Sequence, residues 1–127
     1  MEPYTGDMVA ITDKEEELVR LLTSMELSKN VARTLVCLAA LEESTSQQIE
    51  RATGLRQPEV SIAIQELRDR GWAVKRDIKR ARKGRPVHSY RLGVTFEEIL
   101  TAIESQEKER IKRMEAALGR LRALAKK

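Results

Sequence analysis

The hydrophobic periodicity of the chain changes twice, and these changes constrain the fold more than any other feature. Apolar residues recur at the helical spacing of three and four over residues 12–71, and again from residue 95 onward. Residues 72–78 and 87–92 instead alternate between apolar and polar types, as strands do, around a stretch with a glycine and a proline. The pattern therefore predicts a mostly α fold (α+β) with one β-hairpin and a long C-terminal helix.

Residue types that favour helix ends divide the first helical part into four helices. Serine, threonine and aspartate side chains accept hydrogen bonds from the first backbone N–H groups of a helix, and proline fits its first turn. Gly54 tolerates positive φ and ends the short third helix at residues 46–53, and Gly71 ends the fourth. The predicted starts are Thr12 or Asp13, then Ser28, then Thr45 or Ser46, and last Pro58.

The same periodicity predicts which side chains form the core. Each helix presents an apolar stripe to the core, and each strand presents one of its two faces. The predicted inward residues are Leu18, Leu21, Leu22 and Met25 in the first helix, Val31, Leu35, Leu38 and Ala39 in the second, Ile49 and Ala52 in the third, Val60, Ala63, Ile64 and Leu67 in the fourth, and Trp72, Val74, Ile78, Tyr90 and Leu92 in the strands.

The C-terminal helix is too long for a small domain to cover. It begins at a capping box formed by Thr95 and Glu98 and runs to about Leu124, which gives a length of about 45 Å. Its far apolar stripe needs a partner, and we expect a second copy of the same helix in a short coiled coil, either parallel or antiparallel. The alternative is a helix that folds back on its own domain. The predicted dimerisation residues are Leu100, Ile103, Ile111, Met114, Leu118 and Leu121.

The residue inventory argues against catalysis and against a metal site. The chain has one cysteine, Cys37, and one histidine, His88, so it cannot form an intrachain disulfide and has too few soft ligands for structural zinc. It has no glycine-rich phosphate loop and no nucleophile with a base at a suitable spacing, so we expect neither an enzyme nor a cofactor. We expect Cys37 to be a small buried apolar residue and His88 to lie on the surface.

Two further observations bear on partners and location. Aromatic residues make up only 3% of the chain, too few for a platform that stacks single-stranded nucleic acid. No apolar run approaches the roughly 18 residues of a membrane span, and the N-terminus lacks the pattern of a secretory signal. A cytoplasmic protein without membrane contact is therefore the expectation.

Positive charge is concentrated in one segment. Residues 75–91 contain eight basic residues and one acidic residue, a net charge of +7, whereas the whole chain carries +4. The rest of the chain therefore carries +4 minus +7, or −3. A mildly acidic body with one basic projection is typical of a protein that binds a polyanion. The alternative is a solvated, charge-rich loop.

The order of the predicted elements resembles the winged helix-turn-helix domain of prokaryotic transcription regulators. The pattern is similar to that of small archaeal regulators of the TrmB, MarR and ArsR kind, and it covers about residues 28–94. The segments that carry it are residues 49–55 (IERATGL), Val60 and Ser61 with Leu67, residues 70–72 (RGW), residues 83–86 (KGRP) and residues 90–92 (YRL).

This resemblance implies a homodimer that binds operator DNA, in many cases as a repressor. It identifies no small-molecule effector. The sequence shows no large C-terminal effector domain of the kind found in sugar-sensing TrmB proteins. It also lacks the cysteine or histidine clusters of metal-sensing ArsR proteins.

The resemblance makes residues 58–70 the recognition helix and residues 79–87 the wing. A recognition helix enters the major groove of double-stranded DNA and presents its N-terminal residues to the base edges. Basic side chains of the wing bind phosphates or enter a narrow minor groove. The predicted DNA-binding residues are Ser46, Gln47, Arg56, Gln57, Glu59, Ser61, Ile62, Gln65, Arg68, Arg80, Arg82, Lys83 and Arg85.

Several of these residues have a second interpretation. Ile62 either contacts a thymine methyl group or packs against the wing or the first helix. Glu59 either accepts a hydrogen bond from cytosine or only favours the start of its helix. Ser46 and Gln47 either donate to a phosphate or cap the third helix. Gln57 or Gln65 can read adenine, whereas Arg56 can read guanine or bind a phosphate.

The sequence thus predicts a flexible arm over residues 1–11, a winged helix-turn-helix domain over 12–94 and a dimerisation helix over 95–127. The predicted function is a sequence-specific regulator that binds double-stranded DNA, with α-helix 58–70 in the major groove. The alternative is a winged-helix module for protein–protein interaction in a larger assembly, without direct contact to bases. Recognition of an RNA duplex by its shape also remains open.

Overall fold

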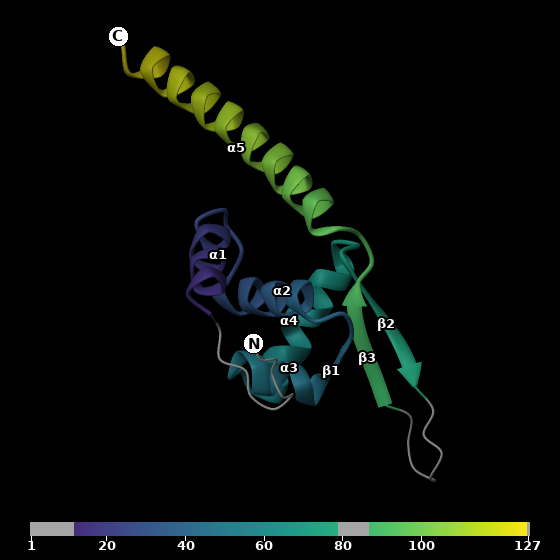
Figure 1. Cartoon of the computed structure of the whole chain (residues 1–127). Helices are drawn as coiled ribbons and strands as arrows, with labels where there is room; N and C mark the ends of the chain where they lie inside the picture. Colours follow the sequence, from purple (N-terminus) through teal and green to yellow (C-terminus); the bar gives the residue numbers. More distant parts are fainter. Residues whose placement is uncertain (1–11, 79–86, 127) are drawn as a thin grey trace. The chain divides into compact units, whose positions relative to one another are not determined.

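The computed structural model of the chain describes residues 12–78 and 87–126. The contacts between Cα atoms divide the chain into two units, residues 1–95 and 96–127, and each is described by itself. The elements, in chain order (Figure 1), are α1 (Asp13–Thr23), α2 (Lys29–Ala40), β1 (Ser44–Thr45), α3 (Ser46–Thr53), α4 (Gln57–Asp69), β2 (Ala73–Ile78), β3 (Val87–Leu92) and α5 (Phe96–Ala125).

The starts of the first three helices are set by hydroxyl caps, as the sequence predicts. The hydroxyl groups of Thr12, Ser28 and Thr45 accept hydrogen bonds from backbone N–H groups in the first turns of α1, α2 and α3. The Thr12 and Thr45 caps are capping boxes, since a side chain three residues on accepts from the N–H of the cap. Gly54 ends α3 with φ of 78°, a conformation that glycine adopts without strain.

Helix α2 is the centre of the first unit. Helices α1, α3 and α4 and strand β3 all pack on it. Leu35 of α2, Ile49 of α3 and Leu67 of α4 are fully buried. The predicted inward residues of α4, Val60, Ala63, Ile64 and Leu67, are all buried, so the prediction for this helix is confirmed.

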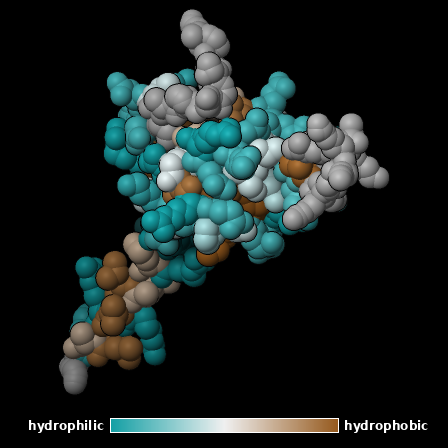
Figure 2. Space-filling model, turned by 90° about the horizontal axis from the view of Figure 1, so that it is seen from below, coloured by the Kyte–Doolittle hydropathy of each residue, from teal (hydrophilic) through white to brown (hydrophobic). Residues whose placement is uncertain are grey.

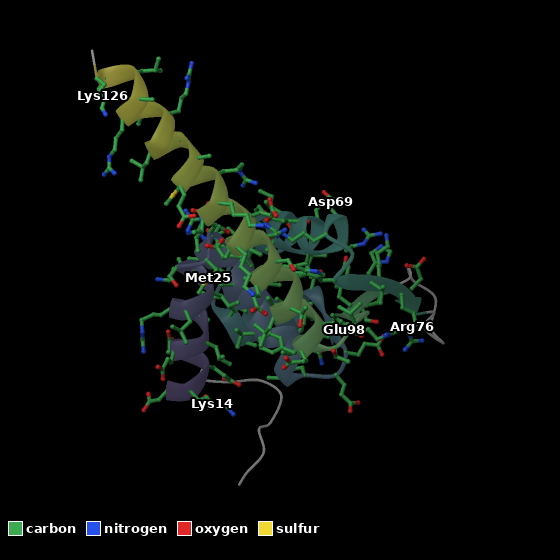
Figure 3. All side chains as sticks on the ribbon, turned by 90° about the horizontal axis from the view of Figure 1, so that it is seen from above. Lys14, Met25, Asp69, Arg76, Glu98 and Lys126 are labelled. Atoms are coloured by element: carbon green, nitrogen blue, oxygen red, sulfur yellow. The ribbon has the colours of Figure 1, made fainter. Side chains whose placement is uncertain are left out.

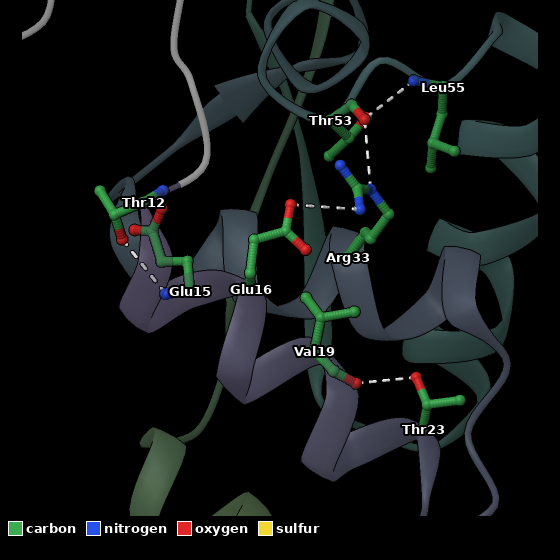
Figure 4. A network of polar contacts seen from close by, with 8 residues as sticks. All are labelled: Thr12, Glu15, Glu16, Val19, Thr23, Arg33, Thr53 and Leu55. Carbon is green, nitrogen blue, oxygen red and sulfur yellow. Dashed lines mark hydrogen bonds and ion pairs between the residues drawn. The ribbon is translucent and has the colours of Figure 1, made fainter.

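The prediction for α1 was partly wrong. Val19 and Leu22 are buried, whereas Leu21 and Met25 are exposed. A helical stripe of apolar residues can be drawn along two overlapping faces, and tertiary contacts select one of them. The selected face carries Glu16, whose carboxylate lies 3.8 Å from the guanidinium of Arg33 on α2 (Figure 4).

Arg33 also reaches the end of α3. Its Nε donates a hydrogen bond of 3.3 Å to the carbonyl of Thr53, and the Thr53 hydroxyl accepts one from the N–H of Leu55 (Figure 4). One side chain thus connects α1, α2 and the turn between α3 and α4. The direction in which α4 leaves that turn is fixed by these bonds together with the buried face of α4.

The sheet has three strands in the order β1–β3–β2, all antiparallel, and so is larger than the predicted hairpin. Strand β1 has only two residues, Ser44 and Thr45, which pair with Tyr90 and Ser89 of β3. A segment of two residues is too short to show alternation, so the sequence gives no signal for it. Strands β2 and β3 pair from Ala73 opposite Leu92 to Ile78 opposite Val87.

The predicted inward faces of the strands need correction. Trp72 is buried as predicted, but it precedes β2. Within β2, Ala73 is buried and the predicted Val74 is 37% exposed. On β3 the buried residue is Ser89, and the predicted Tyr90 and Leu92 are only half-buried. The hydroxyl of Ser89 donates a hydrogen bond to the carboxylate of Glu43. The side chain of Ile78 lies outside the described residues.

In α5, the buried residues are Ile99 and Ile103. Ile99 was not among the residues that the sequence analysis identified, and Leu100, a predicted dimerisation residue, is 38% exposed. The apolar residues farther along α5 are exposed and form a run of hydrophobic surface toward the C-terminus (Figure 2): Ile111, Met114, Leu118, Leu121 and Leu124. Among the described residues, no helix is long and apolar enough to cross a membrane.

The burial of Cys37 predicts an unreactive thiol. Cys37 is 8% exposed, and burial, followed by the nearby charge of Glu15, raises the pKa of its thiol to about 12. Because only the thiolate is nucleophilic, its population at pH 8 falls by roughly 1000-fold compared with an ordinary cysteine. We expect labelling by a disulfide reagent to be far slower in the folded protein than in denaturant. Equal rates in the two states would contradict the burial.

Candidate nucleic-acid interface

The face of α4 opposite the core is exposed along its length. Its inward residues contact the rest of the first unit, so the remaining side chains point to solvent. All seven predicted contact residues on or beside this helix are exposed: Arg56, Gln57, Glu59, Ser61, Ile62, Gln65 and Arg68. We call this set the α4 face.

Ile62 is the apolar member of the α4 face. It is 70% exposed, the highest value among the large apolar residues that the structure exposes. Its side chain is therefore not buried in a core contact, which was the second interpretation of Ile62. An isolated exposed isoleucine amid polar residues is available for apolar contact with a ligand, such as a thymine methyl group.

Two polar side chains of the α4 face form hydrogen bonds within the helix. Glu59 Oε1 accepts from the backbone N–H of Arg56 at 2.8 Å, so Glu59 serves the start of the helix, the second of its two interpretations. Gln65 Nε2 donates to Asp69 Oδ1 at 2.9 Å. Any base that Gln65 reads by two hydrogen bonds must compete with Asp69 for the amide group.

At the start of α3, the residue that caps the helix is Thr45 and not Ser46 or Gln47. Thr45 caps the helix together with Gln48, so capping does not explain Ser46 or Gln47. Ser46 is half-buried and Gln47 is exposed. Gln47 is therefore accessible to a ligand at this helix end.

A carboxylate that the sequence reasoning missed binds the base of the wing. Glu43 accepts two hydrogen bonds from the guanidinium of Arg76, at 2.9 and 3.0 Å, and a third from the hydroxyl of Ser89. Figure 3 labels Arg76 on β2. The bonds from Arg76 and Ser89 lower the pKa of Glu43 to about 2. Glu43 and Arg76 are 33 positions apart, and the pairing follows from the strand register, which no local pattern predicts.

Glu43 changes the charge balance of the basic segment. Arg76 is one of the eight cations in residues 75–91, and its charge is compensated by Glu43 from outside that segment. The acidic residue in the segment, Asp77, lies opposite His88 in the register, with 2.7 Å between Oδ1 and Nδ1. Lys75 and Arg91 remain exposed on the two strands. His88 is exposed, as predicted.

The tip of the wing lies outside the described residues. This applies to four of the predicted contact residues, Arg80, Arg82, Lys83 and Arg85. The described residues contain no group of three or more histidine, cysteine, aspartate or glutamate side chains that could hold a metal ion.

The Glu43 bonds predict how stability depends on pH. The pKa of Glu43 is lowered from 4.5 to about 2 in the folded chain, so the stabilisation is present above pH 4.5 and is lost as the pH falls toward 2. We expect Glu43→Gln to lower the free energy of unfolding at pH 7 and to flatten its decline between pH 4.5 and 2, measured by denaturant titration. Glu42→Gln, at the exposed neighbour, is the control. Identical acid limbs for wild type and Glu43→Gln would contradict the assignment.

One family model and several solved structures are similar to this chain. The sequence model of the MarR family matches residues 25–84. No curated protein sequence matches the chain.

Solved structures are similar in fold but distant in sequence. TrmBL2, an archaeal chromatin protein, is 22% identical with a TM-score of 0.63; the match covers 87% of this chain but 40% of that one, so this chain spans less than half the length of TrmBL2. A possible transcriptional regulator from Methanosarcina mazei Go1 is 12% identical with a TM-score of 0.63, over 83% and 86% of the two chains. A MarR family transcriptional regulator from Silicibacter pomeroyi DSS is 20% identical with a TM-score of 0.52, over 89% and 80%.

These findings agree with the fold expected from the sequence. MarR family winged-helix regulators are DNA-binding proteins and not enzymes. Their fold, helices around a small antiparallel sheet, is the fold of this chain. Residues 25–84 thus match the model of the MarR family, and the chain has the winged-helix fold of these structures.

Proposed function

We propose that the chain is a sequence-specific regulator that binds double-stranded DNA through the α4 face and acts as a homodimer. In this proposal α4 lies in the major groove and the wing, residues 79–87, contacts the backbone or the minor groove. The observation that carries the proposal is the α4 face itself, an exposed row of arginine, glutamine, serine and isoleucine on a helix whose other side is fully buried.

The turn between α3 and α4 supports the proposal because its hydrogen bonds hold α4 in place. A helix-turn-helix presents its second helix to the groove only if the first helix and the turn are held rigidly. Arg33 donates a hydrogen bond to Thr53 at the end of α3, and Thr53 accepts one from Leu55 in the turn. Gly54 supplies the positive φ that the turn needs. A rigid α4 is the condition for reading bases rather than only phosphates.

The side chains of the α4 face match the hydrogen-bonding groups of the major groove. Arginine binds guanine O6 and N7, glutamine binds adenine N6 and N7, and an apolar side chain contacts the thymine methyl group. Arg56, Gln57 and Ser61 lie at the N-terminal end of α4, which is the end that reaches base edges in proteins of this fold. Arg68 lies in the last turn and is suited to a phosphate.

The wing is proposed to supply affinity that does not depend on sequence. Lys75 and Arg91 are exposed on its strands, and four more cations occupy residues 80–85 of the sequence. Cations that neutralise phosphates release counterions, so binding weakens with salt by a log–log slope of about −0.9 per contact on duplex DNA.

The homodimer and the repressor role belong to the same proposal. Exposed apolar residues on α5 suit a second copy of that helix, with Ile111, Met114, Leu118 and Leu121 as contacts. Leu100 is partly exposed, whereas Ile103 is already buried in the single chain and is less available. Repression is inferred from the resemblance, because a dimer on an operator blocks other proteins from the same DNA.

The test of the proposal is a titration of random duplex DNA followed by fluorescence anisotropy at low salt. We expect binding at micromolar protein or below, and a duplex selected from a random pool to bind more tightly. Absence of binding to any duplex at micromolar protein would overturn the proposal and favour the protein–protein interaction module.

Removal of wing arginines should change how DNA binding depends on salt. Arg82→Ala combined with Arg85→Ala should weaken binding to all duplexes, and the log–log salt slope should become shallower by up to about 3.6 if each arginine neutralises one phosphate in each of two subunits. Arg113→Ala combined with Arg120→Ala removes two exposed α5 charges and is the matched control. An unchanged slope in the wing variant would contradict the role of the wing.

Substitution of Gln65 should weaken DNA binding in a way that depends on the DNA sequence. Gln65→Ala should cost about 1–3 kcal/mol of binding free energy on the selected duplex and little on random DNA, because only the selected duplex offers the base that it reads. Gln106→Ala on α5 removes the same amide from an exposed helix and should change neither. Equal losses on both duplexes would exclude Gln65 from reading bases.

A further inference from the structure

The exposed apolar residues of α5 lie at heptad positions. Ile111 and Leu118 occupy position a, and Met114 and Leu121 occupy position d; together we call them the distal stripe. Each is between 46% and 62% exposed, so the single chain leaves the distal stripe largely uncovered. Two heptads of apolar a and d residues form a short seam that fits one partner helix.

We propose that the distal stripe pairs with the distal stripe of a second copy in parallel and in register, from Ile111 to Ala125. This inference rests on the proposed homodimer and adds its orientation. The charges beside the seam carry it, because they attract in the parallel pair and repel in the antiparallel one.

In the parallel pair, position g of one helix faces position e of the next heptad in its partner. Arg110 is at position g and Glu115 at the following position e, so Arg110 of each chain meets the partner's Glu115. A guanidinium has five N–H donors and can bind two carboxylates at once. Arg110 therefore keeps its bond to Glu107 of its own helix, at 2.8 Å, when it meets the partner.

The antiparallel pair has one register that places every residue of the distal stripe against another. In it Ile111 lies opposite the partner's Leu121, and Met114 opposite the partner's Leu118. Antiparallel helices bring position e against position e. Glu115 then faces the partner's Glu115, and Lys108 faces the partner's Arg122, so each flanking contact at e joins like charges.

The residues before Ile111 limit the length of the parallel seam. Glu104 and Glu107 continue positions a and d toward the N-terminus, and a pair of helices in contact there would bring carboxylates together. Each carboxylate is instead bound within its own helix, Glu104 by Lys108 at 3.1 Å and Glu107 by Arg110. The paired segment thus begins at Ile111. In the parallel pair, both winged domains join the seam at the same end.

The first experiment is a cysteine cross-linking test in the full chain with Cys37→Ala. Ala125→Cys places a thiol at position a, where it faces its own copy only in the parallel pair. In the antiparallel register the two residues 125 lie about 27 Å apart along the seam, far beyond the reach of a disulfide. Ala117→Cys, the matched alanine variant at position g, faces its own copy only in the antiparallel pair.

We expect mild oxidation to cross-link Ala125→Cys rapidly and Ala117→Cys slowly. Faster cross-linking of Ala117→Cys would overturn the parallel assignment and leave the DNA-binding proposal intact. Sedimentation that shows monomers at tens of micromolar would overturn pairing altogether. DNA binding is scored separately by anisotropy, so failure of the parallel pairing and failure of DNA binding are distinguishable.

A charge reversal tests the same assignment without cysteines. Glu115→Arg should raise the dimer dissociation constant about tenfold in sedimentation, and Arg110→Glu combined with Glu115→Arg should restore it, because the pair is attractive again. Arg113→Glu, at an exposed position away from the seam, is the control and should have little effect. A dissociation constant that does not respond to Glu115→Arg would contradict the parallel pair, since only that pair joins residues 110 and 115.

Discussion

The packing of α2 against four other elements is the constraint on which the rest of the first unit depends. Leu35 contributes a fully buried side chain, and α1, α3, α4 and β3 each bury one face against this helix. A helix that gives one face to α2 has its opposite face in solvent. For α4 that opposite face is the row of arginine, glutamine, serine and isoleucine that we propose to read DNA. The same packing that stabilises the fold thereby exposes the binding surface.

A second constraint joins the sheet to the loop after α2. Glu43 stands just before β1 and binds Arg76 of β2 and Ser89 of β3, so one carboxylate spans all three strands at the base of the wing. This bond network fixes the strands from which residues 79–86 extend. It also neutralises Arg76, whereas Lys75 and Arg91 remain exposed on the described strands. Arg76 therefore serves to hold the sheet together. The uncompensated positive charge of residues 75–91 is smaller than their count of eight basic residues suggests.

The sequence predicted what depends on local chemistry and missed what depends on contacts between distant residues. Hydroxyl caps such as Thr12 and Thr45, and the buried face of α4, follow from residues within one or two turns. Strand β1 has no local signal, and neither does the burial of Ser89, whose hydroxyl donates to Glu43 from a distant part of the chain. The α4 face was predictable because it is the complement of a clear apolar stripe. Glu43 was not, because its partners are 33 and 46 positions away.

The hydrogen bond between Gln65 and Asp69 bears on how the α4 face can discriminate between sequences. A side chain that is unpaired in the free protein gains from any acceptor that it meets. Gln65 must instead give up a bond of 2.9 Å before its amide group can bind a base. Adenine offers a donor and an acceptor that replace this bond and add another, whereas a base with a mismatched edge leaves polar groups unpaired at a cost of about 1–3 kcal/mol. In the proposed complex, only a base that satisfies both ends of the amide compensates for the loss of this internal bond.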